Sequence, residues 1–180
     1  MSFHTTPNYL TLTRIILVPV STGLLFAEKS APGHYGLGAA IFFGIASLTD
    51  YFDGYIARLQ QTETIYGKLL DPLADKFLVV ASIIALQDLG RIHPIVVIIL
   101  ICRELAITGL RALASAEGVI LPASRSAKWK TATQMCAIPC LMVAGIFLTL
   151  GTILLYISLC MSLWSAREYV IDFFKNLRRK

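Results

Sequence analysis

The sequence predicts an all-α membrane protein that crosses the bilayer six times and forms a single domain over residues 1–180. Of its 180 residues, 56% are apolar and 15% are charged, whereas soluble domains average about 45–50% apolar and about 25% charged. So few charges do not cover the surface of a soluble globule of this size. Several apolar runs also reach the roughly 20 residues that a spanning helix needs.

The first two spans are the simplest. Residues 9–27 are apolar except for Arg14, and residues 30–49 contain no charged side chain. The first run has roughly the shape of a cleaved signal peptide. The apolar runs that follow indicate instead a polytopic protein whose first helix serves as its own insertion signal.

The remaining four spans are less regular. Residues 68–87 and 92–110 have the length of a span but carry ionisable groups. The uncharged run of residues 131–166 is about 54 Å long at about 1.5 Å per residue, which suits two crossings rather than one. Gly151 is the expected turn between these two helices.

The basic residues predict the orientation. Six spans bring both termini to one side, and fourteen of the sixteen Lys and Arg residues fall on that side, leaving Lys29 and Arg91 on the other. The positive-inside rule therefore predicts an inner or plasma membrane protein with cytoplasmic termini. The net charge of +5 suits anionic lipid headgroups. We expect no nucleic-acid partner, because the basic residues are divided among membrane-bounded loops.

Four aspartates form the most informative pattern. Asp50 and Asp53 are three residues apart at the end of the second helix, and Asp71 and Asp75 are four apart at the start of the third. Each pair therefore shares a helix face. The short polar link at residues 59–66 should return the chain as an antiparallel neighbour, so that all four carboxylates meet at the cytoplasmic border of the membrane.

Four carboxylates beside lipid need compensating cations, because proximity and desolvation both disfavour their ionised forms. Two divalent ions about 3.5–4 Å apart would supply that charge, and hard oxygen ligands favour Mg²⁺ or Mn²⁺. Ion pairing with Arg58, Lys68 and Lys76 is the structural alternative. The active site is therefore expected on the cytoplasmic side.

The residues around the aspartates carry a family resemblance. The run Asp50-x2-Asp53-Gly54-x2-Ala57-Arg58-x8-Gly67-x3-Asp71-x3-Asp75 resembles, at every position, the signature of the CDP-alcohol phosphotransferase family. The resemblance implies a six-helix membrane fold over essentially the whole chain and a homodimer. It also implies metal ligation by all four aspartates, with Asp75 as general base as well. The CDP site would be lined by Gly54, Ala57, Arg58 and Gly67.

A second resemblance lies near the start of the chain. Residues 7–14 resemble the entry segment of that family, which supplies polar contacts to the nucleotide. By this resemblance Asn8 and Thr11 join the CDP-binding residues. A plain helix start accounts for the same segment.

Two later segments bear on the acceptor alcohol. Arg103-Glu104 with Leu110-Arg111, and the run from Lys128 and Lys130 to Gln134, resemble the phosphatidylglycerophosphate synthase branch of the family, although Ala127 replaces a glycine of that branch. Arg103, Arg111, Lys128 and Lys130 form a cationic group that suits an acceptor bearing a phosphate. Positive-inside topology is the alternative reason for these charges.

These patterns together predict a metal-dependent phosphatidyltransferase of phospholipid biosynthesis. It would transfer the phosphatidyl group of CDP-diacylglycerol to the hydroxyl of glycerol 3-phosphate, giving phosphatidylglycerophosphate and CMP. Within the family, the alternative acceptors are an inositol phosphate and phosphatidylglycerol. From another class, a cation transporter or channel also places acidic residues in membrane helices, although transport sites usually lie near the midplane.

Overall fold

The structure is a computed structural model that describes residues 6–60, 65–116, 124–143 and 145–177. Within those ranges, the side chains of residues 6–15, 50–60, 65–75, 116 and 176–177 lie outside the description. The described residues form six helices and no strand, which confirms the all-α prediction. The helices are α1 (Thr6–Ser30), α2 (Gly36–Gln60), α3 (Ile65–Asp88), α4 (Pro94–Ala116), α5 (Arg125–Met142) and α6 (Ile146–Leu177).

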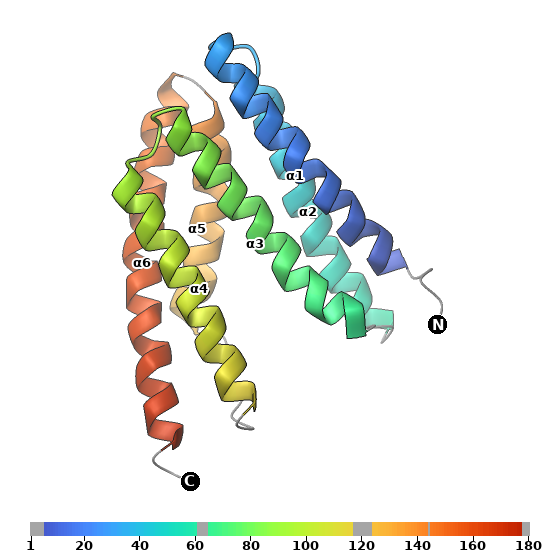
Figure 1. Cartoon of the computed structure of the whole chain (residues 1–180), viewed down its shortest axis with the longest axis vertical. Helices are drawn as coiled ribbons and strands as arrows, with labels where there is room; N and C mark the ends of the chain where they lie inside the picture. Colours follow the sequence, from blue (N-terminus) through green and yellow to red (C-terminus); the bar gives the residue numbers. More distant parts are fainter. Residues whose placement is uncertain (1–5, 61–64, 117–123, 144, 178–180) are drawn as a thin grey trace.

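The helices pack as two groups that α3 and α2 connect. α1 packs against α2, and α5 packs against α6, which also contacts α4. α3 contacts α1, α2, α4 and α5 (Figure 1), and α2 also packs against α5, so both α3 and α2 join the two groups. α1 begins and α6 ends at the same end of the bundle (Figure 1). An even number of helices, each antiparallel to the one before it, brings the two termini to the same end.

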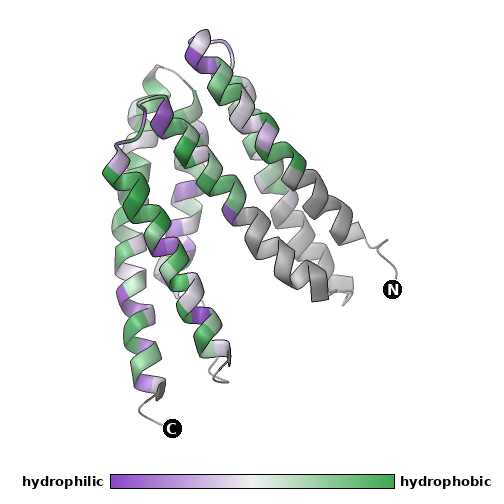
Figure 2. Cartoon of the chain, in the orientation of Figure 1, coloured by the Kyte–Doolittle hydropathy of each residue, from purple (hydrophilic) through white to green (hydrophobic). Residues whose placement is uncertain are grey.

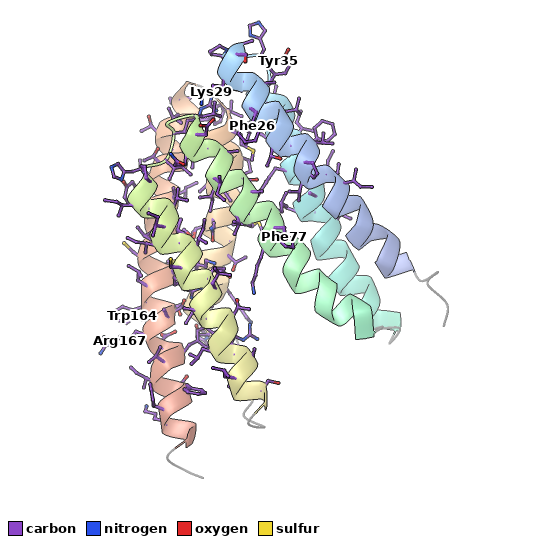
Figure 3. All side chains as sticks on the ribbon, in the orientation of Figure 1. Phe26, Lys29, Tyr35, Phe77, Trp164 and Arg167 are labelled. Carbon is purple, nitrogen blue, oxygen red and sulfur yellow. The ribbon has the colours of Figure 1, made fainter. Side chains whose placement is uncertain are left out.

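Apolar side chains occupy both the interior and the outside of the bundle. Leu25, Phe43, Leu86 and Ile138 come from four different helices and are each 0% exposed. Apolar residues also dominate the visible faces of α4 and α6 (Figure 2). Large apolar side chains such as Phe77 are well exposed, and Trp164 on α6 points away from the neighbouring helices (Figure 3). Helices that are apolar all round are typical of proteins embedded in a bilayer.

One helix of the described part of the chain is long and apolar enough to cross a membrane by length and composition: α6, between Ile146 and Lys175. The apolar part of α2, Gly36–Thr49, is shorter. α4 has sufficient length, but Arg103, Glu104 and Arg111 interrupt its apolar composition. The described residues therefore form six helices, of which α6 has the length and composition of a span.

The turn between the last two helices differs from the sequence prediction. α5 ends at Met142 and α6 begins at Ile146, so Gly151 lies inside α6 and the predicted turn at Gly151 is wrong. Gly145 makes the turn instead, with a φ of 80°, a left-handed conformation that glycine adopts without steric cost. Gly151 serves close packing, because a Cβ there would lie 2.8 Å from the backbone nitrogen of Leu141.

A buried ion pair fixes the end of the bundle where α1 meets α2. The Oε1 atom of Glu28 accepts hydrogen bonds from Gly33 N at 2.7 Å and from Arg91 Nη2 at 3.1 Å. Its Oε2 atom accepts from Tyr35 N at 2.7 Å and from Gly36 N at 2.9 Å. The Glu28 side chain is 1% exposed. One carboxylate therefore binds three backbone N–H groups of the α1–α2 turn and fixes its conformation.

Arg91 extends this cluster to α5. Its Nη1 atom donates to the carbonyl oxygens of Leu141 at 2.9 Å and Met142 at 2.6 Å. Carbonyls in the last turn of a helix have no partner within the helix, so Arg91 caps α5. The pair Glu28–Arg91 therefore ties the α1–α2 turn and the α3–α4 connection to the end of α5.

Gly36 allows the start of α2 to lie close to the backbone at the end of α5. A Cβ at Gly36 would lie 2.1 Å from the carbonyl oxygen of Met142, whereas a Cβ at Gly44, two turns further along α2, would meet nothing within 4 Å. We expect Gly36→Ala to lower the free energy of unfolding by about 1–3 kcal/mol, because the backbones must separate. Thermal unfolding in detergent measures the effect. Gly44→Ala is the matched control, and an equal loss in both variants would contradict this explanation.

Candidate functional site

The four aspartates lie on two helices that contact each other. Asp50 and Asp53 belong to the C-terminal part of α2, and Asp71 and Asp75 to the N-terminal part of α3. α2 ends at Gln60 and α3 begins at Ile65, so the helical segments agree with the sequence prediction. The four side chains lie outside the described residues, and their role as metal ligands stays a prediction.

The predicted CDP contacts fall in the same part of the chain. Their side chains also lie outside the description, and they belong to α1, α2 and α3: Asn8, Thr11, Gly54, Ala57, Arg58 and Gly67. Among the residues that are described, no three His, Cys, Asp or Glu side chains gather as a metal site.

The described part of the site is built around Glu104 of α4. Its Oε2 atom accepts hydrogen bonds from Lys130 Nζ of α5 at 2.5 Å and from Arg103 Nη1 at 3.3 Å. The side chains of both cations are 8% exposed, and that of Glu104 is 25% exposed. Two of the predicted acceptor-binding residues, Arg103 and Lys130, are therefore held together by one carboxylate.

Arg103 also joins α4 to α6. Its Nε atom donates to the carbonyl oxygen of Ser162 at 2.9 Å, and its Nη2 atom donates to the hydroxyl of Ser165. The serines are small enough for α4 to approach α6 closely, and both are buried. A guanidinium has five N–H donors in a fixed plane, so these contacts set the orientation of Arg103 firmly.

A small cavity adjoins this carboxylate. Its volume is about 40 Å³, and Lys76, Glu104, Lys130 and Gln134 are the polar residues with long side chains on its wall. A volume of that size holds a water molecule or more. Lys76 comes from α3 and donates from Nζ to the hydroxyl of Thr108 on α4 at 2.5 Å. The cavity is therefore bounded by α3, α4 and α5, with ammonium groups from two of them.

Of the predicted acceptor-binding residues, Lys130 is on the cavity wall and Arg103 pairs with Glu104 beside it, whereas Arg111 and Lys128 are not on the wall. Arg111 and Lys128 are exposed, and neither forms an ion pair with another residue that the structure describes. Sequence reasoning did not assign Lys76 or Gln134 to this site. Gln134 follows Lys130 by four residues, which is the spacing that places two side chains on one helix face. Lys76 follows Asp75 directly.

A second set of hydrogen bonds fixes the start of α5 against α6. Ser126 Oγ donates to Glu168 Oε2 at 2.5 Å, and Trp164 Nε1 donates to Glu168 Oε1 at 3.1 Å. The backbone nitrogen of Ser124, the N-cap of α5, donates to the hydroxyl of Tyr169 at 3.3 Å. None of these side chains lines the cavity beside Glu104.

Comparison with known proteins shows the family of this chain. The model of the CDP-alcohol phosphatidyltransferase family matches residues 4–164. A protein of Rickettsia typhi named CDP-diacylglycerol–glycerol-3-phosphate 3-phosphatidyltransferase is 37% identical over 169 residues, which cover 91% of this chain and 93% of the relative. A protein of Bacillus subtilis with the same name is 40% identical over 147 residues, covering 76% of each chain. The chain therefore belongs to the CDP-alcohol phosphatidyltransferase family.

Proposed function

We propose that this enzyme transfers the phosphatidyl group of CDP-diacylglycerol to the hydroxyl of glycerol 3-phosphate, giving phosphatidylglycerophosphate and CMP. The relatives that share the length of this chain carry the name of that reaction. The observation that carries the proposal is the cavity between α3, α4 and α5, whose wall includes Lys76 and Lys130. Because Lys76 follows Asp75 in the chain, the cavity adjoins the helical segment of α3 that carries the predicted base.

The donor site is proposed at the facing parts of α2 and α3. Asp50, Asp53, Asp71 and Asp75 supply hard oxygen ligands, a donor set that fits two Mg²⁺ or Mn²⁺ ions. Such ions, when bound, neutralise the pyrophosphate of the donor and the CMP that leaves. The small residues Gly54, Ala57 and Gly67 leave room for the nucleotide to approach the helix backbones, and Asn8, Thr11 and Arg58 provide polar contacts to it.

The transfer itself needs a base and an in-line approach. Asp75 accepts the proton of the acceptor hydroxyl, whose oxygen attacks the phosphorus atom linked to diacylglycerol. A new P–O bond forms to the acceptor, and the bond from that phosphorus to the bridging oxygen of the pyrophosphate breaks. CMP leaves with the electron pair of that bond. The reaction needs no covalent enzyme intermediate.

The acceptor is proposed to bind through its phosphate. Lys130 and Lys76 offer ammonium groups at the cavity, Arg103 lies beside them, and Arg111 and Lys128 extend the positive charge to the surface. A phosphate dianion is stabilised by several such donors. A neutral alcohol has no group to pair with them, so the charge at the cavity favours glycerol 3-phosphate.

The membrane arrangement is part of the proposal. The protein belongs to a membrane-associated family of enzymes, and α6 has the composition of a span. We propose that all six helices cross the inner or plasma membrane, with both termini and the active site in the cytoplasm, as the distribution of Lys and Arg favours. In this arrangement the lipid tails lie beside the helices while the charged groups meet at the interface. A homodimer follows from the family resemblance.

A panel of alcohols tests the proposed acceptor. Purified protein in liposomes is given labelled CDP-diacylglycerol, Mg²⁺ and one alcohol at a time: glycerol 3-phosphate, inositol phosphate, phosphatidylglycerol or glycerol. We expect CMP release to depend on both metal and alcohol, and glycerol 3-phosphate to be the dominant acceptor. Dominance of another alcohol would contradict the proposed acceptor. Release that persists in a chelator would contradict the metal site, and the absence of release with every alcohol would contradict the enzyme.

A further inference from the structure

Glu104 is an anion placed among cations at the proposed acceptor site. It receives hydrogen bonds from Lys130 at 2.5 Å and from Arg103 at 3.3 Å, and it lines the cavity that Lys76 borders from α3. The side chains of Lys130 and Arg103 are 8% exposed. Buried cations need a compensating charge, and Glu104 supplies it to both at once.

Glu104 also restrains the side chain of Lys130. A lysine side chain has four rotatable carbon–carbon bonds and loses considerable entropy when it is held in one conformation. The short contact with Glu104 holds the ammonium at the cavity wall. Arg103 is itself hydrogen-bonded to Ser162 and Ser165 of α6, so its contact with Glu104 also restrains the Glu104 carboxylate.

The charges around the cavity suit a phosphate monoester. Lys76 and Lys130 line the cavity together with Glu104, and Arg103 pairs with the same carboxylate. A phosphate monoester, which carries about −1.5 to −2 near pH 7, is attracted by these cations. Without Glu104 the same cations would repel one another before the acceptor arrives.

We propose that Glu104 is a positioning residue of the acceptor site, which holds Lys130 at the cavity wall and Arg103 beside it, so that the phosphate of the acceptor meets preformed cations. The inference rests on the proposed function, because it requires an acceptor that bears a phosphate. Glu104 acts through the two cations and does not itself touch the reacting atoms.

The test compares Glu104→Gln with the wild type in liposomes, with glycerol 3-phosphate and CDP-diacylglycerol varied in turn. Glutamine keeps the size and one hydrogen-bond acceptor but removes the charge. We expect the acceptor KM to rise about tenfold or more, while the donor KM stays within about twofold. KM does not depend on the fraction of enzyme that is folded, so a loss of stability does not mimic this result. Glu104→Asp, which keeps the charge on a shorter side chain, should fall between the two.

Glu168→Gln is the matched control. Glu168 also accepts a 2.5 Å hydrogen bond from α5, but its partner there is the neutral Ser126. Its acceptor KM should remain within about twofold of the wild type. An unchanged acceptor KM in Glu104→Gln, or an equal rise in both KM values, would overturn the inference while the wild type still transfers to glycerol 3-phosphate. A wild type that does not use glycerol 3-phosphate would overturn the proposed function, and the role of Glu104 with it.

Discussion

Replacing Asp75 by asparagine is expected to lower kcat for CMP release by a factor of about 10²–10⁴, the usual contribution of a general base. Asparagine has nearly the same size but does not accept the proton of the acceptor hydroxyl. Asp75 is also one of the predicted metal ligands, so two roles are lost together. Initial rates in liposomes at saturating donor and acceptor measure the effect.

Asp88→Asn provides the control in the same helix. Asp88 lies at the other end of α3, where its exposed side chain pairs with Lys29 at 2.8 Å. Its kcat should remain within about twofold of the wild type, because surface ion pairs contribute little. Turnover of Asp75→Asn that returns at high Mg²⁺ would show that Asp75 is a ligand and not the base. If Asp75→Asn turned over at the wild-type rate at ordinary Mg²⁺, Asp75 would be neither ligand nor base.

Replacing Arg91 by methionine should cause the largest loss of stability, about 3–5 kcal/mol in the free energy of unfolding. The change leaves the Glu28 carboxylate, 1% exposed, without its cation. It also removes the donor from the carbonyl oxygens of Leu141 and Met142. Methionine keeps the length of the side chain, so packing changes little. Denaturant unfolding in detergent micelles measures the loss.

Lys29→Met is the comparison for that prediction, because its ion pair with Asp88 lies at the same end of the bundle with side chains 58% and 42% exposed. Its loss should be about 0–1 kcal/mol. The double variant Glu28→Gln, Arg91→Met should lose less than the sum of the two single variants, since the groups act as a unit. Equal losses in Arg91→Met and Lys29→Met would contradict the buried pair.

Low pH is expected to weaken the cluster of Glu28 and Arg91. Glu28 follows the apolar run of residues 9–27. Burial would by itself raise its pKa, but the three backbone N–H donors and Arg91 outweigh burial and hold the pKa below its ordinary value. A carboxyl group with a lowered pKa in the folded state stabilises the protein above its unfolded pKa, about 4.3. That contribution is lost as the pH falls through the lower pKa of the folded state.

The helices could be predicted from the sequence because length and apolarity are local properties. The turn at Gly145 could not, because Gly145 and Gly151 are equally plausible turn residues until the packing of α5 on α6 is known. Gly151 is needed for close contact with Leu141, a requirement that no local pattern reveals. Glu28 and Arg91 are 63 residues apart in the chain, and nothing in either segment identifies the other as its partner.

The candidate site also has a part that the sequence predicts and a part that only the packing of the helices reveals. The aspartates follow from fixed spacing on two helices, and the basic residues of α4 and α5 from their position in apolar segments. Which cations meet depends on how α3, α4 and α5 pack. The sequence therefore grouped Arg103, Arg111, Lys128 and Lys130 by charge, whereas the structure gathers Arg103, Lys130 and Lys76 around Glu104.

The attachment of Arg103 to α6 fixes the height of this cation along the proposed span. α6 has 32 residues, about 48 Å at about 1.5 Å per residue, and exceeds the roughly 30 Å of hydrocarbon that it would cross. Its uncharged part, residues 146–166, is about 32 Å long at about 1.5 Å per residue and matches that thickness, so the charged last turns would extend beyond it. Since Ser162 and Ser165 bind the guanidinium near the end of the uncharged part, Arg103 is anchored where the proposed span reaches the membrane border.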